Sequence, residues 1–325
     1  MSIQRTGKNA IQYLLVATAA VVVGQGRASA DVLYASTGDA NRIVSVDTTT
    51  GSVNTVFTTP NPPPDGLTVD GAGSRILYLD QGNNAGSGQL RAYNLTTGAD
   101  TLIAGGLSRP ADITLDGPNT VLVSEFNAGR IDRINLTTGA VSRLGSYGGT
   151  PNGLTFDASG RLFAVLGTRT GGPTGSFVAQ LNPITGAIIA QTAGLNSVDG
   201  LTFDRFTGQL FGASTLGSVL YSINPNNLSS VVGIALPGLA DGVYSNGRGD
   251  LFIGGRPPAG QTGASIFDYN LVTGVITTSA TIAGSGSIDL VGAVPEPSTF
   301  ALVAIGSIAC AGRYGLGRRR RRAAV

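Results

Sequence analysis

The stretch DGLTFDRFTGQLFGASTLGSVLYSIN, residues Asp199–Asn224, is the most complete copy of a motif that recurs along the chain. Short runs rich in β-branched and aromatic residues alternate in it with turns that contain glycine. Such a pattern predicts, in order, a strand, a glycine turn, a second strand, a loop and a third strand. The copies of this motif decide the fold.

The first recurring landmark is a polar residue followed by an apolar–Thr–apolar strand and usually an aspartate. It occurs as DGLTVD (Asp65–Asp70), ADITLD (Ala111–Asp116), NGLTFD (Asn152–Asp157) and DGLTFD (Asp199–Asp204), with a weaker copy, DGVYSN, at Asp241–Asn246. We take its leading polar residues as Asp65, Asp112, Asn152, Asp199 and Asp241, which are 47, 40, 47 and 42 residues apart. A period of this size is typical of the four-stranded blades of a β-propeller.

The second landmark is a turn that opens on an Asx residue and, in five of its six copies, ends in glycine. Its six copies are DTTTG (Asp47–Gly51), NLTTG (Asn94–Gly98), NLTTG (Asn135–Gly139), NPITG (Asn182–Gly186), NPNNL (Asn224–Leu228) and NLVTG (Asn270–Gly274). An Asx side chain opens such a turn by accepting hydrogen bonds from nearby backbone, and glycine supplies the positive φ. Six turns predict six blades.

Only five inner strands precede the last turn, so one blade lacks its innermost strand. The segment SIDLVG, Ser287–Gly292, fits the missing strand. We therefore predict that residues 31–62 supply three strands of a blade and that this C-terminal segment closes the ring, which removes the exposed strand edges. A parallel β-helix is the competing architecture, but its coils are shorter than this period.

At the level of single residues, the body resembles the six-bladed propellers of the NHL-repeat and gluconolactonase types. The resemblance is clearest in VLVSEFNAGRIDRIN (Val121–Asn135), where Asn127, Arg130 and Ile131 fall as in the NHL pattern. It covers roughly residues 31–292, and we assign residues 31–293 to the propeller domain.

Composition narrows the possible functions of this body. The chain of 325 residues has a formal charge of +2, yet residues 31–297 hold 12 arginines, no lysine and 19 acidic residues, a net charge of −7. An acidic body without basic clusters argues against nucleic acid as a partner. Because the chain contains no histidine, Ser-His-Asp and Cys-His catalysis and His-ligated zinc are excluded.

The first 30 residues predict a secretory signal peptide. Arg5 and Lys8 form a positive region, Ile11–Val23 is a mostly apolar stretch, and Ala28-Ser29-Ala30 is a small-residue cleavage site. The alternative is an uncleaved N-terminal anchor, although the apolar stretch is short for a membrane span.

Residues 294–325 carry a second targeting pattern. Val294-Pro295-Glu296-Pro297-Ser298 precedes an apolar run, which is followed by Arg313 and by the arginine cluster Arg318, Arg319, Arg320, Arg321 and Arg322. This order resembles the PEP-CTERM sorting tail of Gram-negative bacteria. The resemblance implies processing by an exosortase, a membrane protease, and delivery to the cell surface or an exopolysaccharide matrix.

The physics of this tail agrees with the resemblance. Residues 298–317 would span about 30 Å as a helix, enough for the hydrocarbon core. The arginine cluster would hold the C-terminus in the cytoplasm and leave the propeller outside. We therefore predict a single transmembrane sorting helix before processing. A plain tail anchor is the alternative.

The leading residues of the inner strands are the candidate metal site. Asp65, Asp112, Asn152, Asp199 and Asp241, with Asp289 as a sixth, would lie at one end of the central channel, where their oxygens suit Ca²⁺ or another divalent cation. The resemblance to lactonases implies a divalent ion held by Glu, Asn and Asp, but this chain has Asp at the first-blade Glu position. The alternative is that each aspartate caps its strand or turn.

Glu125, the only glutamate of the propeller, is interpreted as a strand-edge or loop residue without a catalytic role. Two function classes stay open. One is an exported surface protein whose propeller binds a polymer such as exopolysaccharide, a peptide or surface protein, or an ion. The other is a secreted metal-dependent hydrolase or lactonase. A polar channel mouth with a bound metal would favour the hydrolase, and a channel plugged by side chains would favour the binding protein.

Overall fold

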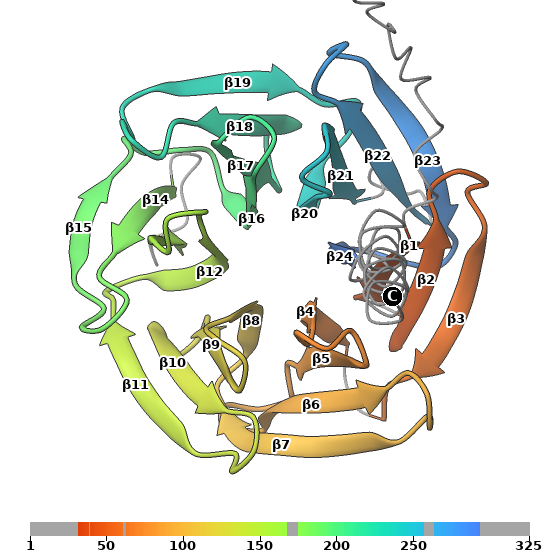
Figure 1. Ribbon diagram of the computed structural model, residues 1–325, viewed down its shortest axis with the longest axis vertical. Coiled ribbons are helices and arrows are strands. Elements are labelled where there is room, and N and C mark those ends of the chain that lie inside the picture. Colours follow the sequence, from red (N-terminus) through yellow and green to blue (C-terminus); the bar gives the residue numbers. More distant parts are fainter. Residues whose placement is uncertain (1–31, 39, 61–62, 168–174, 257–262, 293–325) are drawn as a thin grey trace, which may run out of the picture.

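The computed structural model describes residues 32–38, 40–60, 63–167, 175–256 and 263–292. In these ranges the chain contains strands β1 to β24 and no helix, and the strands form six four-stranded sheets. The sheets stand around a central axis as blades (Figure 1). The described part of the chain is thus an all-β six-bladed propeller, as the repeat predicts.

Blades 2 to 6 each consist of four consecutive strands, with the first strand innermost (Figure 1). Blade 2 comprises β4 (Pro64–Val69), β5 (Arg75–Asp80), β6 (Gly88–Asn94) and β7 (Asp100–Leu107). Blade 3 comprises β8 (Pro110–Leu115), β9 (Thr120–Glu125), β10 (Arg130–Asn135) and β11 (Val141–Ser146). Blade 4 comprises β12 (Thr150–Phe156), β13 (Leu162–Gly167), β14 (Ser176–Leu181) and β15 (Ile188–Gln191).

The remaining strands complete the ring. Blade 5 comprises β16 (Val198–Asp204), β17 (Gln209–Ser214), β18 (Val219–Ile223) and β19 (Val231–Ala235). Blade 6 comprises β20 (Ala240–Ser245), β21 (Asp250–Gly255), β22 (Ala264–Asn270) and β23 (Ile276–Ile282). Blade 1 comprises β1 (Val32–Thr37), β2 (Arg42–Asp47), β3 (Val53–Thr58) and the C-terminal strand β24 (Ile288–Gly292).

Strand β24 closes the ring as predicted. It pairs antiparallel with β1, from Leu33 opposite Gly292 to Thr37 opposite Ile288. In Figure 1 it lies beside β1 on the inner side of blade 1. The two ends of the propeller thereby share one sheet, and the inner edge of β1 is covered.

The Asx–Gly turns join the third and fourth strands of the blades and have the predicted chemistry. In blade 2, Oδ1 of Asn94 accepts hydrogen bonds from the backbone N–H groups of Thr96 (2.9 Å) and Thr97 (2.8 Å). Gly98 then adopts a φ of 71°, in the left-handed region that favours glycine. The corresponding asparagines of blades 3, 4 and 6 make the same pair of bonds.

The hydrophobic core is divided into clusters that lie between neighbouring blades. For example, Leu33 and Val44 of blade 1 belong to the same buried cluster as Phe252 and Ile266 of blade 6. Second strands such as β5 and β21 are buried along almost their whole length, because a blade covers each of their faces. Burial of each such large apolar side chain stabilises the fold by about 1.5–3 kcal/mol.

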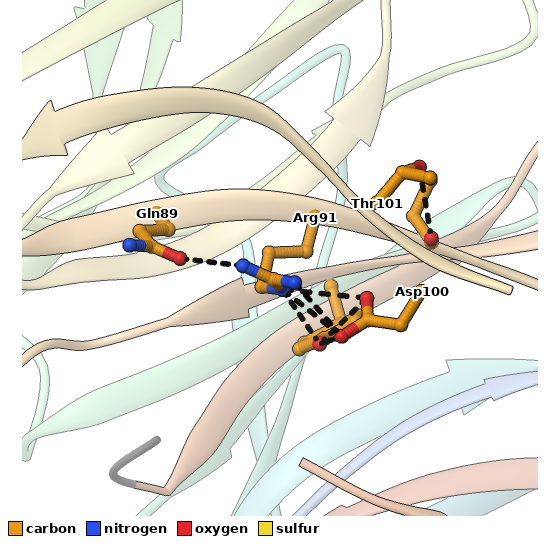
Figure 2. Close-up of polar contacts among 6 residues, drawn as sticks. Gln89, Arg91, Asp100 and Thr101 are labelled. Carbon is orange, nitrogen blue, oxygen red and sulfur yellow. Dashed lines mark hydrogen bonds and ion pairs between the residues drawn. The ribbon is translucent and has the colours of Figure 1, made fainter. Parts of the chain in front are cut away.

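Aromatic rings meet at the seam between blades 1 and 2, and a polar network within blade 2 holds one of them. The ring of Phe57 from β3 meets the edge of Tyr78 from β5, with centroids 5.3 Å apart. The Tyr78 hydroxyl donates to the Asp100 carboxylate (3.1 Å), which also accepts from Arg91 (3.0 Å), and Arg91 donates to Gln89 (2.8 Å) (Figure 2). Burial and the charge of Asp100 raise the pKa of Tyr78, so the hydroxyl remains a donor.

Three predicted segments fall outside the described residues: the signal peptide, the sorting motif with its arginine cluster, and the transmembrane helix between them. Within the described ranges, no helix has the length and apolar character needed to cross a membrane.

Candidate functional site

The inner strands of blades 2 to 6 each begin with a β-bulge, and the bulges place the repeated polar residues at the channel. In blade 5, Val198 lies opposite Ser214 and Leu201 opposite Gly212, so Asp199 and Gly200 together face a single residue of β17. The same shift occurs in the other four blades of this group. A bulge breaks the alternation of a strand and redirects its side chains, which here turns the bulge residues toward the axis.

Close approach of neighbouring inner strands explains the glycine of the bulge. A Cβ atom on Gly200 would lie 2.7 Å from the backbone oxygen of Asp241, in the next blade. One on Gly153 would lie 2.5 Å from the backbone oxygen of Asp199, and one on Gly66 would lie 2.6 Å from Cα of Asp112. Side chains are therefore excluded at these positions by backbone, which cannot move aside as a flexible side chain would.

The register corrects our assignment of Asp112 as a leading residue. Asp65, Asn152, Asp199 and Asp241 occupy the first bulge position, but in blade 3 that position is Ala111, and Asp112 takes the place of the glycine. The prediction equated Asp112 with the leading aspartates of the other copies, although the equivalent residue is Ala111, one position earlier. In blade 1, β24 has no bulge, and Asp289 alone lies opposite Ser36.

The channel carboxyls therefore lie in two layers. Asp65, Asp199 and Asp241 line a cavity at one end of the channel, while Asp112 and Asp289 line a smaller cavity toward the other end. Asn152 and Asp199 border both cavities, as does Ala111. The bulge residues and Asp289 thus form a floor between the two ends, which we call the channel floor.

Hydrogen bonds link the carboxyl groups of the channel floor to one another. Asp289 is hydrogen-bonded to Asp65, and Asp199 is hydrogen-bonded to Asp241. Asn152 donates from Nδ2 to Oδ1 of Asp199. These bonds connect carboxyl groups of neighbouring inner strands around the axis.

Asp112 is bonded differently, to backbone alone. Its two carboxyl oxygens accept from the N–H groups of Ile113 (2.7 Å) and of Leu154 in the next blade (2.5 Å). This side chain therefore joins blades 3 and 4.

Burial makes these acids weak. It raises the pKa of Asp65 to about 6 and that of Asp112 to about 7. Burial, reinforced by the charges of neighbouring aspartates, raises the pKa values of Asp199 and Asp289 well above the ordinary range. The pKa of Asp241 is also raised by burial, against the opposing charge of Arg256. At neutral pH the floor is consequently far less negative than five aspartates would suggest.

These residues fit a divalent cation poorly. The described residues contain no group of three or more His, Cys, Asp or Glu side chains arranged to hold a metal ion. Their oxygens instead bond to one another, to Gln81, to Asn152 and to backbone N–H groups. The Ca²⁺ site stays a prediction for metal analysis to decide.

The channel opens into a polar cavity of about 700 Å³, which we call the mouth cavity. Asp65, Asp199 and Asp241 lie at its base, and its lining includes Asn152, Gln81 and Phe126. The cavity at the opposite end of the channel is smaller, about 230 Å³. The structure thus combines a polar mouth with a floor of side chains, so the two criteria drawn from the sequence do not separate the function classes.

Two arginines on the mouth cavity were not identified from the sequence. Arg256, after β21, forms an ion pair with Asp241 (3.3 Å). Arg109, before β8, places its guanidinium 4.7 Å from the centre of the Phe126 ring. They belong to blades 6 and 3, which face each other across the axis (Figure 1). The only sequence signal for them is their position in the repeat. Arg109 directly precedes the first strand of its blade, and Arg256 directly follows the second strand of its blade.

Glu125 is the last residue of β9 and is fully buried. Its carboxylate accepts from Arg130 (2.9 Å) and from the backbone N–H of Ser108 (2.6 Å). Asp132 adjoins the same arginine (3.0 Å), and burial together with Glu125 raises the pKa of Asp132 to about 7. Glu125 therefore fixes the loop that carries Arg109.

The predicted targeting residues cannot be placed in this way. Ala28, Ala30, the Val294–Ser298 motif, Arg313 and the cluster Arg318–Arg322 all lie outside the described residues.

Comparisons with known proteins show the fold. No family model matches the chain, and no curated protein matches it either. A chain from the crystal structure of a nidogen–laminin complex is similar over 82% of this chain and 99% of its own, with 18% identity and a TM-score of 0.67.

Two further solved structures are similar in fold. TolB from Acinetobacter baumannii aligns with 82% of this chain and 67% of its own, at 14% identity and a TM-score of 0.63. Virginiamycin B lyase from Staphylococcus aureus aligns with 78% of this chain and 88% of its own, at 15% identity and a TM-score of 0.52. The body is thus similar to the propellers of a protein complex, of TolB and of a lyase.

Proposed function

We propose that this protein is an exported cell-surface protein whose propeller binds carbohydrate in the mouth cavity. The observation that carries the proposal is the cavity itself, which is about 700 Å³ in volume and has a base of carboxyl and amide groups. A volume of this size is typical of ligand sites. The fold does not select this activity, because similar propellers occur in a protein complex and in a lyase.

The lining supplies the hydrogen bonds that sugar hydroxyls require. A hydroxyl donates one hydrogen bond and accepts others, so it needs both acceptors and donors around it. Ionised carboxylates such as Asp65 accept, and the amides of Asn152 and Gln81 both donate and accept. This mixture suits a polyhydroxylated ligand better than an apolar one.

The targeting segments support the surface location. The signal peptide with its site at Ala28 and Ala30 provides export, and the Val294–Ser298 motif with its arginine cluster provides exosortase sorting. An exosortase is then the processing partner, and the exopolysaccharide of a Gram-negative-type cell supplies the carbohydrate. The membrane contact through the C-terminal helix lasts only until processing.

Carbohydrate binding is tested with the full chain in detergent and a panel of neutral and acidic tetrasaccharides, by calorimetry. Gln81→Ala should weaken binding about tenfold, because it removes hydrogen-bonding groups worth roughly 1.4 kcal/mol at the cavity. Gln191→Ala is the matched control, since Gln191 is exposed on outer strand β15. Equal affinities for both variants, or no binding by the wild type, would refute the proposal.

Sorting is tested by the intact mass of the protein from the cell surface. We expect a form that begins at Asp31 and lacks Arg318–Arg322. Retention of the arginine cluster in a host with an exosortase would show a plain tail anchor instead.

A second candidate, a hydrolase, is favoured by the carboxyl pair Asp199–Asp241. Buried carboxyls with raised pKa values are frequent at catalytic sites, where one member acts as acid and the other as base. In this case the full chain would hydrolyse sugar lactones or glycosides, and Asp241→Asn would abolish turnover while leaving binding measurable. Slow hydrolysis that is the same in wild type and variant would reject this candidate.

A further inference from the structure

The positively charged guanidinium of Arg109 is available to a ligand in the mouth cavity, because Arg109 is part of its lining. Among the described residues its guanidinium forms no ion pair, whereas Arg256 on the opposite side is engaged by Asp241. The guanidinium lies over Phe126, 4.7 Å from the ring centre. A stacked arginine keeps its edge free, and that edge presents parallel N–H donors that match a carboxylate.

The backbone holds Arg109 in place at the cost of strain. Its φ of 51° lies in the left-handed region that side chains other than glycine rarely adopt. The carbonyl oxygen of Arg109 accepts from the N–H of Phe126 (3.0 Å), and that of Ser108 accepts from the N–H of Asn127 (3.3 Å). The carboxylate of Glu125 accepts from the N–H of Ser108 (2.6 Å). Such strain persists where the surroundings fix it, and it is concentrated at binding sites.

We infer that Arg109 recognises the carboxylate of an acidic sugar, so that the ligand of the mouth cavity is a uronic-acid polysaccharide. The inference rests on the proposed carbohydrate-binding function and narrows its ligand class. A uronic acid unit has one carboxylate among several hydroxyls. The carboxylate matches the guanidinium of Arg109, and the hydroxyls match the carboxyl and amide groups at the base of the mouth cavity.

Charge at the base of the cavity is compatible with such a ligand. Asp241 forms an ion pair with Arg256, and burial raises the pKa of Asp199 well above the ordinary aspartate range. Asp65 is hydrogen-bonded to Asp289, and the charge of Arg109 opposes the rise in the Asp65 pKa that burial causes. The carboxylate of a ligand can therefore pair with the guanidinium of Arg109 without being placed against the aspartates at the base of the cavity.

The test compares tetragalacturonate with its methyl-esterified form, which has the same sugars without charge. We expect the full chain in detergent to bind tetragalacturonate about 10- to 100-fold more tightly, the range for a hydrogen-bonded charged group. Arg109→Gln should remove this preference, and Arg109→Lys should retain only part of it because the planar fork is lost. The C-terminal arginine cluster attracts polyanions too, but it is identical in every variant.

Arg205→Gln is the matched control, since Arg205 is exposed in the turn after β16, and it should keep the full preference. If wild type binds both forms equally, the inference is wrong while carbohydrate binding stands. If it binds neither, both fail. A preference that survives in Arg109→Gln, confirmed as folded by its circular dichroism, would also overturn the role of Arg109.

Discussion

At the scale of single residues, the channel depends on where a side chain is absent as much as on where one is present. Each bulge glycine faces the backbone of the next inner strand at a distance that no Cβ tolerates. The polar residue beside it then turns to the axis and bonds to its neighbours. In blade 3 the glycine position holds Asp112, whose carboxylate accepts from the N–H of Leu154 in the next inner strand.

Gly200→Ala should therefore destabilise the propeller by more than about 2 kcal/mol, because overpacking against backbone costs about 1–3 kcal/mol and the bulge must also shift. The added Cβ would lie 2.7 Å from the backbone oxygen of Asp241. Gly105→Ala is the control, since nothing lies within 4 Å of a Cβ at that position. Urea denaturation measures both. Equal unfolding free energies would show that the inner strands can separate without penalty.

The turn asparagines offer a second test at this scale. Asn182→Ala should lower the free energy of unfolding by about 1 kcal/mol, since Oδ1 of Asn182 accepts from the N–H groups of Ile184 (2.9 Å) and Thr185 (3.0 Å). Asn182→Asp keeps the acceptor and should lose less. A larger loss for Asp than for Ala in the same denaturation experiment would contradict this account.

At the scale of the element, strand β24 is the one that makes the ring. It supplies the inner strand of blade 1 and contributes Ile288 and Leu290 to the cluster shared by blades 1 and 6. It also brings Asp289 beside Asp65. The strand thus contributes at once to sheet pairing, to the core and to the channel floor.

Deletion of residues 284–293 should expose the edge of β1 and cause aggregation. A rescue variant would place residues 285–292 before Val32 through a short turn, because Gly292 lies opposite Leu33 and the two strands are antiparallel. Light scattering and thermal melting compare the three proteins. A deletion variant as soluble and as stable as the full chain would refute the closure.

At the scale of the whole molecule, the propeller surrounds its acids from six sides. Convergence of the inner strands removes water from the carboxyls and brings them together, and both effects raise their pKa values. Hydrogen bonds among the carboxyls connect them around the axis. The folded state accordingly binds more protons than the unfolded chain between the ordinary aspartate pKa and the raised values.

Stability should therefore decrease as pH rises from about 4 to above 7, the window between an ordinary aspartate and the values of about 6 for Asp65 and about 7 for Asp112. Each proton that only the folded state binds gives a slope of about 1.4 kcal/mol per pH unit. Asp199→Asn should flatten this dependence, being close to wild type at pH 5 and more stable at pH 8. Urea denaturation across the range measures it.

Asp70→Asn serves as the control for this prediction. Burial alone would raise the pKa of Asp70, but hydrogen bonds from Arg75 and Ser74 outweigh it and the pKa is lowered. The contribution of Asp70 is therefore present above its unfolded pKa and is lost in acid, so the variant should lose stability at neutral pH. If Ca²⁺ raises the melting temperature of the wild type but not of Asp199→Asn, an ion and not protons neutralises the floor.

The sequence by itself determined the blade count, the turns and the closing strand. These features follow from local chemistry that repeats, because an Asx residue and a glycine form the same turn wherever they occur and alternating β-branched residues form the same strand. The same alternation also predicts that apolar strand residues such as Leu33 and Leu290 are buried in the core.

Only the tertiary structure decided how the channel is built and what lines its mouth. The one-residue offset of Asp112 is a matter of register across strands, which similarity along the chain does not report. The raised pKa values depend on groups such as Asp65 and Asp289 that are far apart in sequence. Arg109 and Arg256 are not part of the repeated motif. They line the same cavity because the six blades converge on one axis.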